Sequence, residues 1–158
     1  MIQKIISCAV LCIALYTLPG CFEKKQTQES LYVINVLDED LYKDCHIKGS
    51  IQVSMPEVEE FVKRLNKDTE LVIYCSNYLC TASGAVADLL GDTGFTNVYA
   101  YEAGMAEWYQ KGLPVDGPCK SSYLKKVMVD PGHEEALKIK VISTEELFEK
   151  MKQAGKLK

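Results

Sequence analysis

The stretch that decides the fold reads Glu70-Leu71-Val72-Ile73-Tyr74-Cys75-Ser76-Asn77-Tyr78-Leu79-Cys80-Thr81. Residues 70–74 form its most apolar part, which is typical of a strand buried in a parallel sheet. A helix is predicted directly after it, because apolar residues recur on one face from Ala82 to Leu90. The stretch is therefore a strand, a short loop that begins with a cysteine, and a helix.

The same alternation continues on both sides of this unit. The other predicted strands cover 31–36, 51–53, 97–101 and 138–142, and the predicted helices cover 58–65, 82–90 and 105–109. Strands that alternate with helices at this spacing require right-handed crossovers. The sequence therefore predicts an α/β fold with a mainly parallel five-stranded sheet and helices on both faces. Ligands of such sheets bind at the carboxyl ends of the strands, where the Cys75 loop lies.

A cysteine between a buried strand and a helix N-terminus is placed to act as a thiolate nucleophile. The amides of the loop residues and the helix N-terminus lower the energy of a thiolate, and they bind anions. The loop residues that we expect to bind substrate are Ser76, Asn77, Tyr78, Leu79 and Thr81. The alternative is that Cys75 is a small buried hydrophobic residue.

A series of further motifs resembles one known family. In chain order they are Val33-Ile34-Asn35-Val36, His46-Ile47-Lys48-Gly49-Ser50-Ile51, Tyr74-Cys75, Thr81-Ala82-Ser83, Gly94-Phe95-Thr96-Asn97-Val98-Tyr99, Glu102-Ala103-Gly104-Met105-Ala106-Glu107-Trp108 and Gly112-Leu113-Pro114-Val115. Over residues 31–118 this series resembles a rhodanese (sulfurtransferase) domain. The resemblance implies that Cys75 takes sulfane sulfur from a small sulfur-containing anion, holds it as a persulfide and passes it to a thiol acceptor, without a cofactor.

Two positions depart from the family pattern. Cys80 stands where many members have an arginine that binds the donor anion, so we expect weak activity with thiosulfate. Asn35 stands where the first strand usually ends in aspartate. Cys80 is either a resolving thiol, which attacks a Cys75 persulfide and releases sulfide, or a packed side chain. The absence of arginine from the loop also argues against phosphatase chemistry.

Three functions are consistent with these residues. The first is sulfur transfer on Cys75, and the second is thiol–disulfide exchange by Cys75 and Cys80 with a thiol-redox protein partner. The third is a non-catalytic binding module of the same fold. The formal charge of −4 without a basic cluster argues against nucleic-acid binding. His46 and His133 show no metal-ligand spacing, so no metal site is expected.

The N-terminal residues indicate a targeting sequence rather than part of the folded domain. Residues 1–20 contain Lys4 and an apolar run from Ile5 to Leu18, the proportions of a secretory signal peptide. The junction with Cys21 resembles the lipidation site of a bacterial lipoprotein, and residues 21–30 would form the tether. An uncleaved anchor is the alternative. Both interpretations place the domain outside the cytoplasm on a membrane, in the periplasm or at the cell surface.

Two further cysteines, Cys45 and Cys119, are expected to form a structural disulfide. Each follows a helix or turn that is predicted to run away from the functional edge of the sheet. We therefore expect them to meet at the edge opposite the Cys75 loop, where an oxidising compartment would join them. Two free thiols, or pairing with a redox partner, remain open.

The C-terminal region combines a linker with a second structural unit. Residues 119–137 are expected to form the linker, and residues 138–158 a strand and a helix with a capping box from Ser143 to Glu146. Domains of the resembled family begin with such a pair, which is not evident before Leu31. We therefore expect the C-terminal pair to complete the domain, either in cis as a permutation or in trans in a swapped homodimer. The alternative is a truncated second repeat whose helix packs loosely or not at all.

Overall fold

The central sheet has five parallel strands in the order β3-β1-β4-β5-β7. The structure is a computed structural model that describes residues 29–127, 129 and 139–157. The strands are β1 (Leu31–Asn35), β3 (Ile51–Gln52), β4 (Glu70–Tyr74), β5 (Val98–Tyr101) and β7 (Lys140–Val141). The predicted α/β class and the parallel five-stranded sheet are confirmed.

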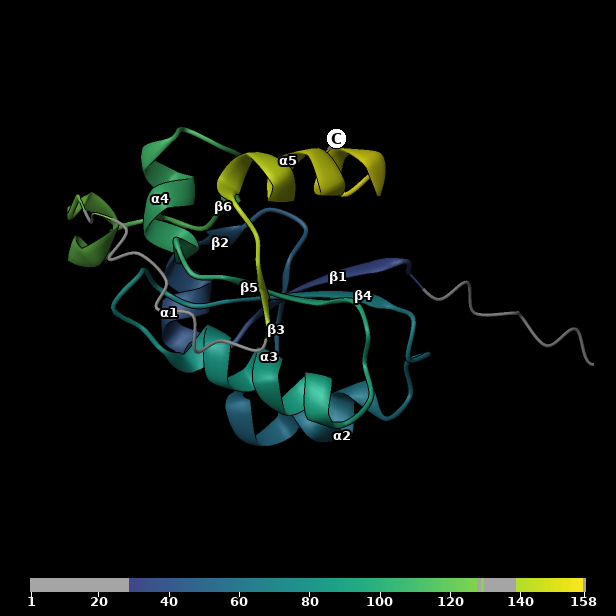
Figure 1. Ribbon diagram of the computed structural model, residues 1–158. Coiled ribbons are helices and arrows are strands. Elements are labelled where there is room, and N and C mark those ends of the chain that lie inside the picture. Colours follow the sequence, from purple (N-terminus) through teal and green to yellow (C-terminus); the bar gives the residue numbers. More distant parts are fainter. Residues whose placement is uncertain (1–28, 128, 130–138, 158) are drawn as a thin grey trace, which may run out of the picture.

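Helices cover both faces of this sheet (Figure 1). One face carries η1 (Met55–Glu57), α2 (Val58–Val62) and α3 (Ala82–Asp92), and the other carries α4 (Gly104–Gln110) and α5 (Thr144–Gln153). Each face has its own apolar cluster. The first includes Val62, Ile73 and Leu90, and the second includes Trp108 and Leu147. Because β4 contributes to both clusters, its carboxyl end is held firmly.

A second, small sheet was not predicted. It pairs β2 (His46–Ile47) with β6 (Val115–Asp116) in antiparallel register. Strands of two residues carry too short a pattern to be recognised in sequence. The pair brings α1 (Glu39–Asp44) close to the segment that follows α4.

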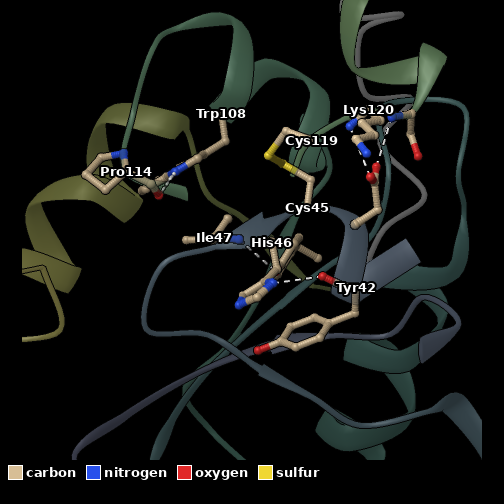
Figure 2. The surroundings of a disulfide bond; sticks show 11 residues. Tyr42, Cys45, His46, Ile47, Trp108, Pro114, Cys119 and Lys120 are labelled. Atoms are coloured by element: carbon tan, nitrogen blue, oxygen red, sulfur yellow. Dashed lines mark hydrogen bonds between the residues drawn. A yellow bond between two sulfur atoms is a disulfide. The ribbon is translucent and has the colours of Figure 1, made fainter. Parts of the chain in front are cut away.

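A disulfide between Cys45 and Cys119 joins the same two segments (Figure 2). The Cα atoms of the two cysteines lie 4.6 Å apart, and Cys45 is fully buried. Beside the bond, the carboxylate of Asp44 accepts hydrogen bonds from the backbone N–H groups of Lys120 and Ser121 at 3.0 and 2.9 Å. The bond therefore lies within a locally ordered turn and not in a linker.

The disulfide does not lie opposite the Cys75 loop, so that expectation is wrong. The Ile47 N–H, two residues after Cys45, donates a hydrogen bond of 3.2 Å to the hydroxyl of Tyr74, the residue that precedes Cys75. The disulfide therefore lies toward the carboxyl end of β4, at the same edge of the sheet as the loop. The reason is the length of α1, which has six residues and spans only about 9 Å, too short to run back along the sheet.

The C-terminal unit docks on the same chain and forms an edge of the sheet. β7 pairs in parallel with β5, with Lys140 opposite Tyr99 and Val141 opposite Ala100. Helix α5 begins with the expected capping box and buries Leu147 in the second cluster. This arrangement corresponds to the in cis alternative.

The expected linker is partly folded. Residues 122–125 form the 3-10 helix η2 (Ser122–Lys125), in which Leu124 is fully buried. The rest of the linker lies mainly outside the described residues, as do the expected signal peptide, Cys21 and most of the tether. Within the described part of the chain, no helix has the length and apolar character needed to span a membrane.

Candidate active site

The loop from Cys75 to Cys80 lies between β4 and α3, and the start of α4 holds its backbone in place. The carbonyl of Cys75 accepts a hydrogen bond from the Met105 N–H at 3.0 Å, and that of Ser76 accepts one from the Ala106 N–H at 2.9 Å. Both loop carbonyls therefore bond to the first turn of α4, which fixes the direction in which the loop leaves the sheet.

Gly104 makes this close approach of helix and loop feasible. It adopts φ +63°, and a Cβ atom there would lie 2.7 Å from the Cys75 carbonyl oxygen and 2.8 Å from the Asn77 nitrogen. Any larger residue would push the loop away from α4, and it would also be strained at this φ. Gly104 appeared in the sequence only as part of a motif, and its effect on the loop depends on tertiary contact.

Within the loop, Asn77 closes a compact turn. Its side-chain oxygen accepts a hydrogen bond from the Leu79 N–H at 3.0 Å, and its carbonyl accepts one from the Cys80 N–H at 2.9 Å. Asn77 itself is buried, whereas the Leu79 side chain at the tip is 74% exposed. The turn brings Cys80 back toward Cys75.

The Cys75 thiol is buried. Its Sγ lies 3.1 Å from the carbonyl oxygen of Cys80 and 3.4 Å from Ser83 Oγ. The hydrogen bond to the Cys80 side chain and the burial of the sulfur both raise the pKa of Cys75. Ser83 was not singled out from the sequence, because its contact arises from the first turn of α3.

Cys80 is the acidic member of the pair. Its side chain is half-buried, and the hydrogen bond from Cys75 together with the amides of Ala82 and Ser76 lowers the pKa of Cys80 to about 5. The Ala82 amide belongs to the N-terminus of α3, where a negative charge is favoured. Of the two thiols, Cys80 is therefore the one whose thiolate form is favoured.

The remaining expected loop residues have different surroundings. Thr81 precedes α3 without a capping hydrogen bond from its side chain, so it contributes backbone rather than side chain. The Tyr78 hydroxyl points to the opposite face of the sheet, where it donates to Glu107 Oε2 at 3.0 Å. Beside Tyr78 lies a cavity of about 410 Å³ that is also lined by Glu107 and residues 141–146 of the C-terminal unit. Glu107 was not predicted as a site residue.

Among the described residues, no cluster of three or more His, Cys, Asp or Glu side chains is arranged to hold a metal ion. The reactive groups that the loop brings together are two free thiols, Cys75 buried and Cys80 half-buried.

The chain was compared with models of protein families and with known proteins. A family model described as Rhodanese-like domain matches residues 19–111. Thiosulfate sulfurtransferase GlpE of Coxiella burnetii is 28% identical over 81 residues, which are 51% of this chain and 74% of the relative.

Solved structures show the same similarity. The crystal structure of the BH2092 protein from Bacillus halodurans has a TM-score of 0.52 at 28% identity, over 58% of this chain and 66% of that one. The solution structure of the rhodanese-like domain of the Anabaena sp. Alr3790 protein also has a TM-score of 0.52. Its identity is 22%, over 69% of this chain and 81% of that one, so it supports the fold alone.

Proposed function

This chain belongs to the family of rhodanese-like domains, and we propose that it transfers sulfane sulfur carried as a persulfide on Cys75. Its relatives include named sulfurtransferases, which supports a sulfurtransferase-type protein. The observation that carries the proposal is the position of Cys75. The cysteine lies at the carboxyl end of the central strand β4, in a loop whose backbone is fixed by α4, with a second thiol beside it.

The pair of thiols supports loading of Cys75. Loading uses the minor protonation state in which the proton has passed from Cys75 to Cys80, since the lowered pKa of Cys80 makes its thiolate a weak base. In that state the Cys75 sulfur attacks the sulfane sulfur of the donor. With thiosulfate, the new S–S bond forms as sulfite leaves with the electron pair of the broken S–S bond. The product is a persulfide on Cys75, and Cys80 is then protonated.

Two routes discharge the persulfide. In the first, the thiolate of an acceptor attacks the outer sulfur, so the acceptor leaves as a persulfide and Cys75 becomes a thiolate again. In the second, the Cys80 thiolate attacks Cys75 Sγ and hydrosulfide leaves with the electron pair. The resulting Cys75–Cys80 disulfide is returned to two thiols by a dithiol redox protein. Because the loop carries no cationic side chain, thiosulfate is expected to bind weakly.

A direct test is the mass of the loop peptides after incubation of the purified protein with thiosulfate or a polysulfide. No lysine or arginine lies between Lys67 and Lys111, so trypsin leaves both loop cysteines on one peptide. Chymotrypsin cleaves after Tyr78 or Leu79 and separates Cys75 from Cys80. We expect one additional sulfur atom on the Cys75 peptide, and none in a Cys75→Ser variant. Absence of sulfur on Cys75 with every donor would refute sulfur carriage and would favour a binding module.

Thiol–disulfide exchange is the second candidate, which the contact of two thiols and the lowered pKa of Cys80 favour. A Cys80→Ser variant separates the two functions. Persulfide loading from a donor of low affinity is expected to survive this change at a reduced rate, whereas dithiol exchange is expected to disappear.

We also propose that the protein is an extracytoplasmic lipoprotein anchored to a membrane through Cys21. The apolar run of residues 5–18 and the disulfide between Cys45 and Cys119 support this location, since such bonds persist in oxidising compartments. Metabolic labelling with a fatty acid should modify the wild-type chain, and a Cys21→Ser variant should lose the label and the membrane association. Equal labelling of both chains would contradict lipidation at Cys21.

A further inference from the structure

Glu107 lies where the Cys75 loop, helix α4 and the C-terminal unit meet. One carboxylate oxygen, Oε2, accepts the hydrogen bond from the Tyr78 hydroxyl of the loop at 3.0 Å. The other, Oε1, accepts a hydrogen bond of 2.6 Å from Thr144 Oγ1, at the first residue of α5. A single side chain therefore connects the loop to a segment that lies 37 residues beyond Glu107 in the chain.

The hydroxyl of Thr144 is oriented by a third partner. A carboxylate only accepts hydrogen bonds, so the one hydrogen of Thr144 Oγ1 must be donated to Glu107. The Tyr101 hydroxyl, 2.8 Å away at the end of β5, must then donate to Thr144 Oγ1. Thr144 and Tyr101 are both buried, so breaking this chain of hydrogen bonds would leave polar groups without water.

The charge of Glu107 is retained despite its partial burial. Burial alone would raise the pKa of its carboxyl group, but the hydrogen bonds from Thr144, Lys111 and Tyr78 lower it below the ordinary value. Lys111 also forms an ion pair with Glu145 at 2.5 Å, which adds a second connection between α4 and the start of α5. Hydrogen bonds to a charged acceptor are the strong ones, so this connection is more than a surface contact.

We propose that Glu107 is a positioning residue through which docking of the C-terminal unit holds the Cys75 loop closed. The unit that completes the sheet thereby also controls access to the buried thiol. This inference rests on the proposed function for its biological meaning, since a closed loop shields the thiol that carries sulfur. The coupling itself is a property of the loop and can be measured without any sulfur donor.

The test is the rate at which iodoacetamide alkylates Cys75 in the full chain under native conditions. Cys75 is fully buried, so its alkylation reports how often the loop opens. Thr144→Val keeps the shape of the side chain and removes the hydroxyl, and we expect it to raise the rate of Cys75 alkylation about fivefold or more, as for loss of one charge-assisted hydrogen bond. Tyr78→Phe should have a similar effect. Thr144→Ser keeps the hydroxyl, so its alkylation rate should equal that of the wild type.

Coupling through Glu107 also predicts how the changes combine. The rate of Cys75 alkylation in the double variant Tyr78→Phe/Thr144→Val should be less than twice the rate in the faster single variant, because both substitutions break the same connection. In a Glu107→Gln background, Thr144→Val should add little. Thr93→Val is the matched control, since it removes a hydroxyl hydrogen bond to the Leu90 carbonyl on the far side of the sheet.

Denaturant unfolding of every variant separates loop opening from global unfolding. The proposal would be overturned if the rate of Cys75 alkylation depended on the free energy of unfolding in the same way in Thr93→Val and Thr144→Val. It would also be overturned if the rate increases of the two single variants multiplied in the double variant. Failure of Cys75 to take up sulfur would refute the proposed function and leave the alkylation result unaffected. The two outcomes are therefore distinguishable.

Discussion

Replacing Cys75 with alanine is expected to raise the pKa of Cys80, because the Cys75 thiol is the main group that stabilises the Cys80 thiolate. Replacing Cys75 with serine is the matched control, since a hydroxyl group still donates a hydrogen bond. The two variants differ by one donor at the same position. Each also leaves Cys80 as the single thiol of the loop, so its titration is not coupled to a second one.

The size of the effect follows from the shift in pKa. A thiol with a pKa of about 5 is about 99% ionised at pH 7, whereas an ordinary cysteine, at about 8.5, is only about 3% ionised. The alkylation rate at pH 7 is nevertheless a poor readout. Nucleophilicity falls with pKa, with a Brønsted coefficient of about 0.4–0.5, so the two effects nearly cancel. The midpoint of the pH profile is the quantity to compare.

The assay is the rate of Cys80 alkylation by iodoacetamide between pH 4 and 10, followed on the peptide that contains Cys80. We expect a midpoint near the wild-type value for Cys75→Ser, and a midpoint at least about one unit higher for Cys75→Ala, the change that one charge-assisted hydrogen bond makes. Equal midpoints in the two variants would refute the role of the Cys75 donor. Equal midpoints near 8.5 would also refute the contribution of the α3 N-terminus.

Three further predictions concern the surroundings of the loop. Gly104→Ala should slow sulfur loading about tenfold or more, since its Cβ would meet the loop backbone at 2.7 Å. The control Gly91→Ala, with no atom within 4 Å of its Cβ, should load at the wild-type rate. Equal loading rates in the two variants would contradict this account. Removing the disulfide by replacing Cys45 and Cys119 with alanine should lower the free energy of unfolding by about 4 kcal/mol for a separation of 74 residues, and a denaturant midpoint unchanged from wild type would show that the bond does not constrain the unfolded chain. Leu147→Ala should cost about 2–5 kcal/mol by emptying part of the second cluster; melting that shifts with protein concentration would instead indicate a swapped homodimer.

The predictable part of the fold is carried by local patterns. Residues 70–74 form a strand because their apolar run is uninterrupted, and residues 82–92 form a helix because apolar side chains recur on one face. The C-terminal unit was also predictable, since Ser143 and Glu146 form a capping box within four residues of sequence. The short strands β2 and β6 were not, because they depend on each other rather than on their own two residues.

The candidate site also has a part that the sequence predicts and a part that it does not. Cys75, and a second cysteine five residues later, were evident in the sequence, because the position of a loop after a buried strand is a local property. The state of the two thiols was not. Which sulfur is buried depends on how tightly Asn77 closes the turn and on how closely Gly104 approaches it.

By itself, the sequence determined the order of strands and helices, the place of the Cys75 loop and the family to which the chain belongs, since all of these depend on neighbours in the chain. Tertiary structure alone decided that the pKa of Cys80 is lowered, that the disulfide lies at the same edge of the sheet as the loop and that Glu107 joins the loop to the C-terminal unit. The physical reason is distance. Burial, hydrogen bonds and charge act between groups that folding brings within a few ångströms. Thr144 contacts the carboxylate that also binds Tyr78 in a fold in which β7 is paired with β5.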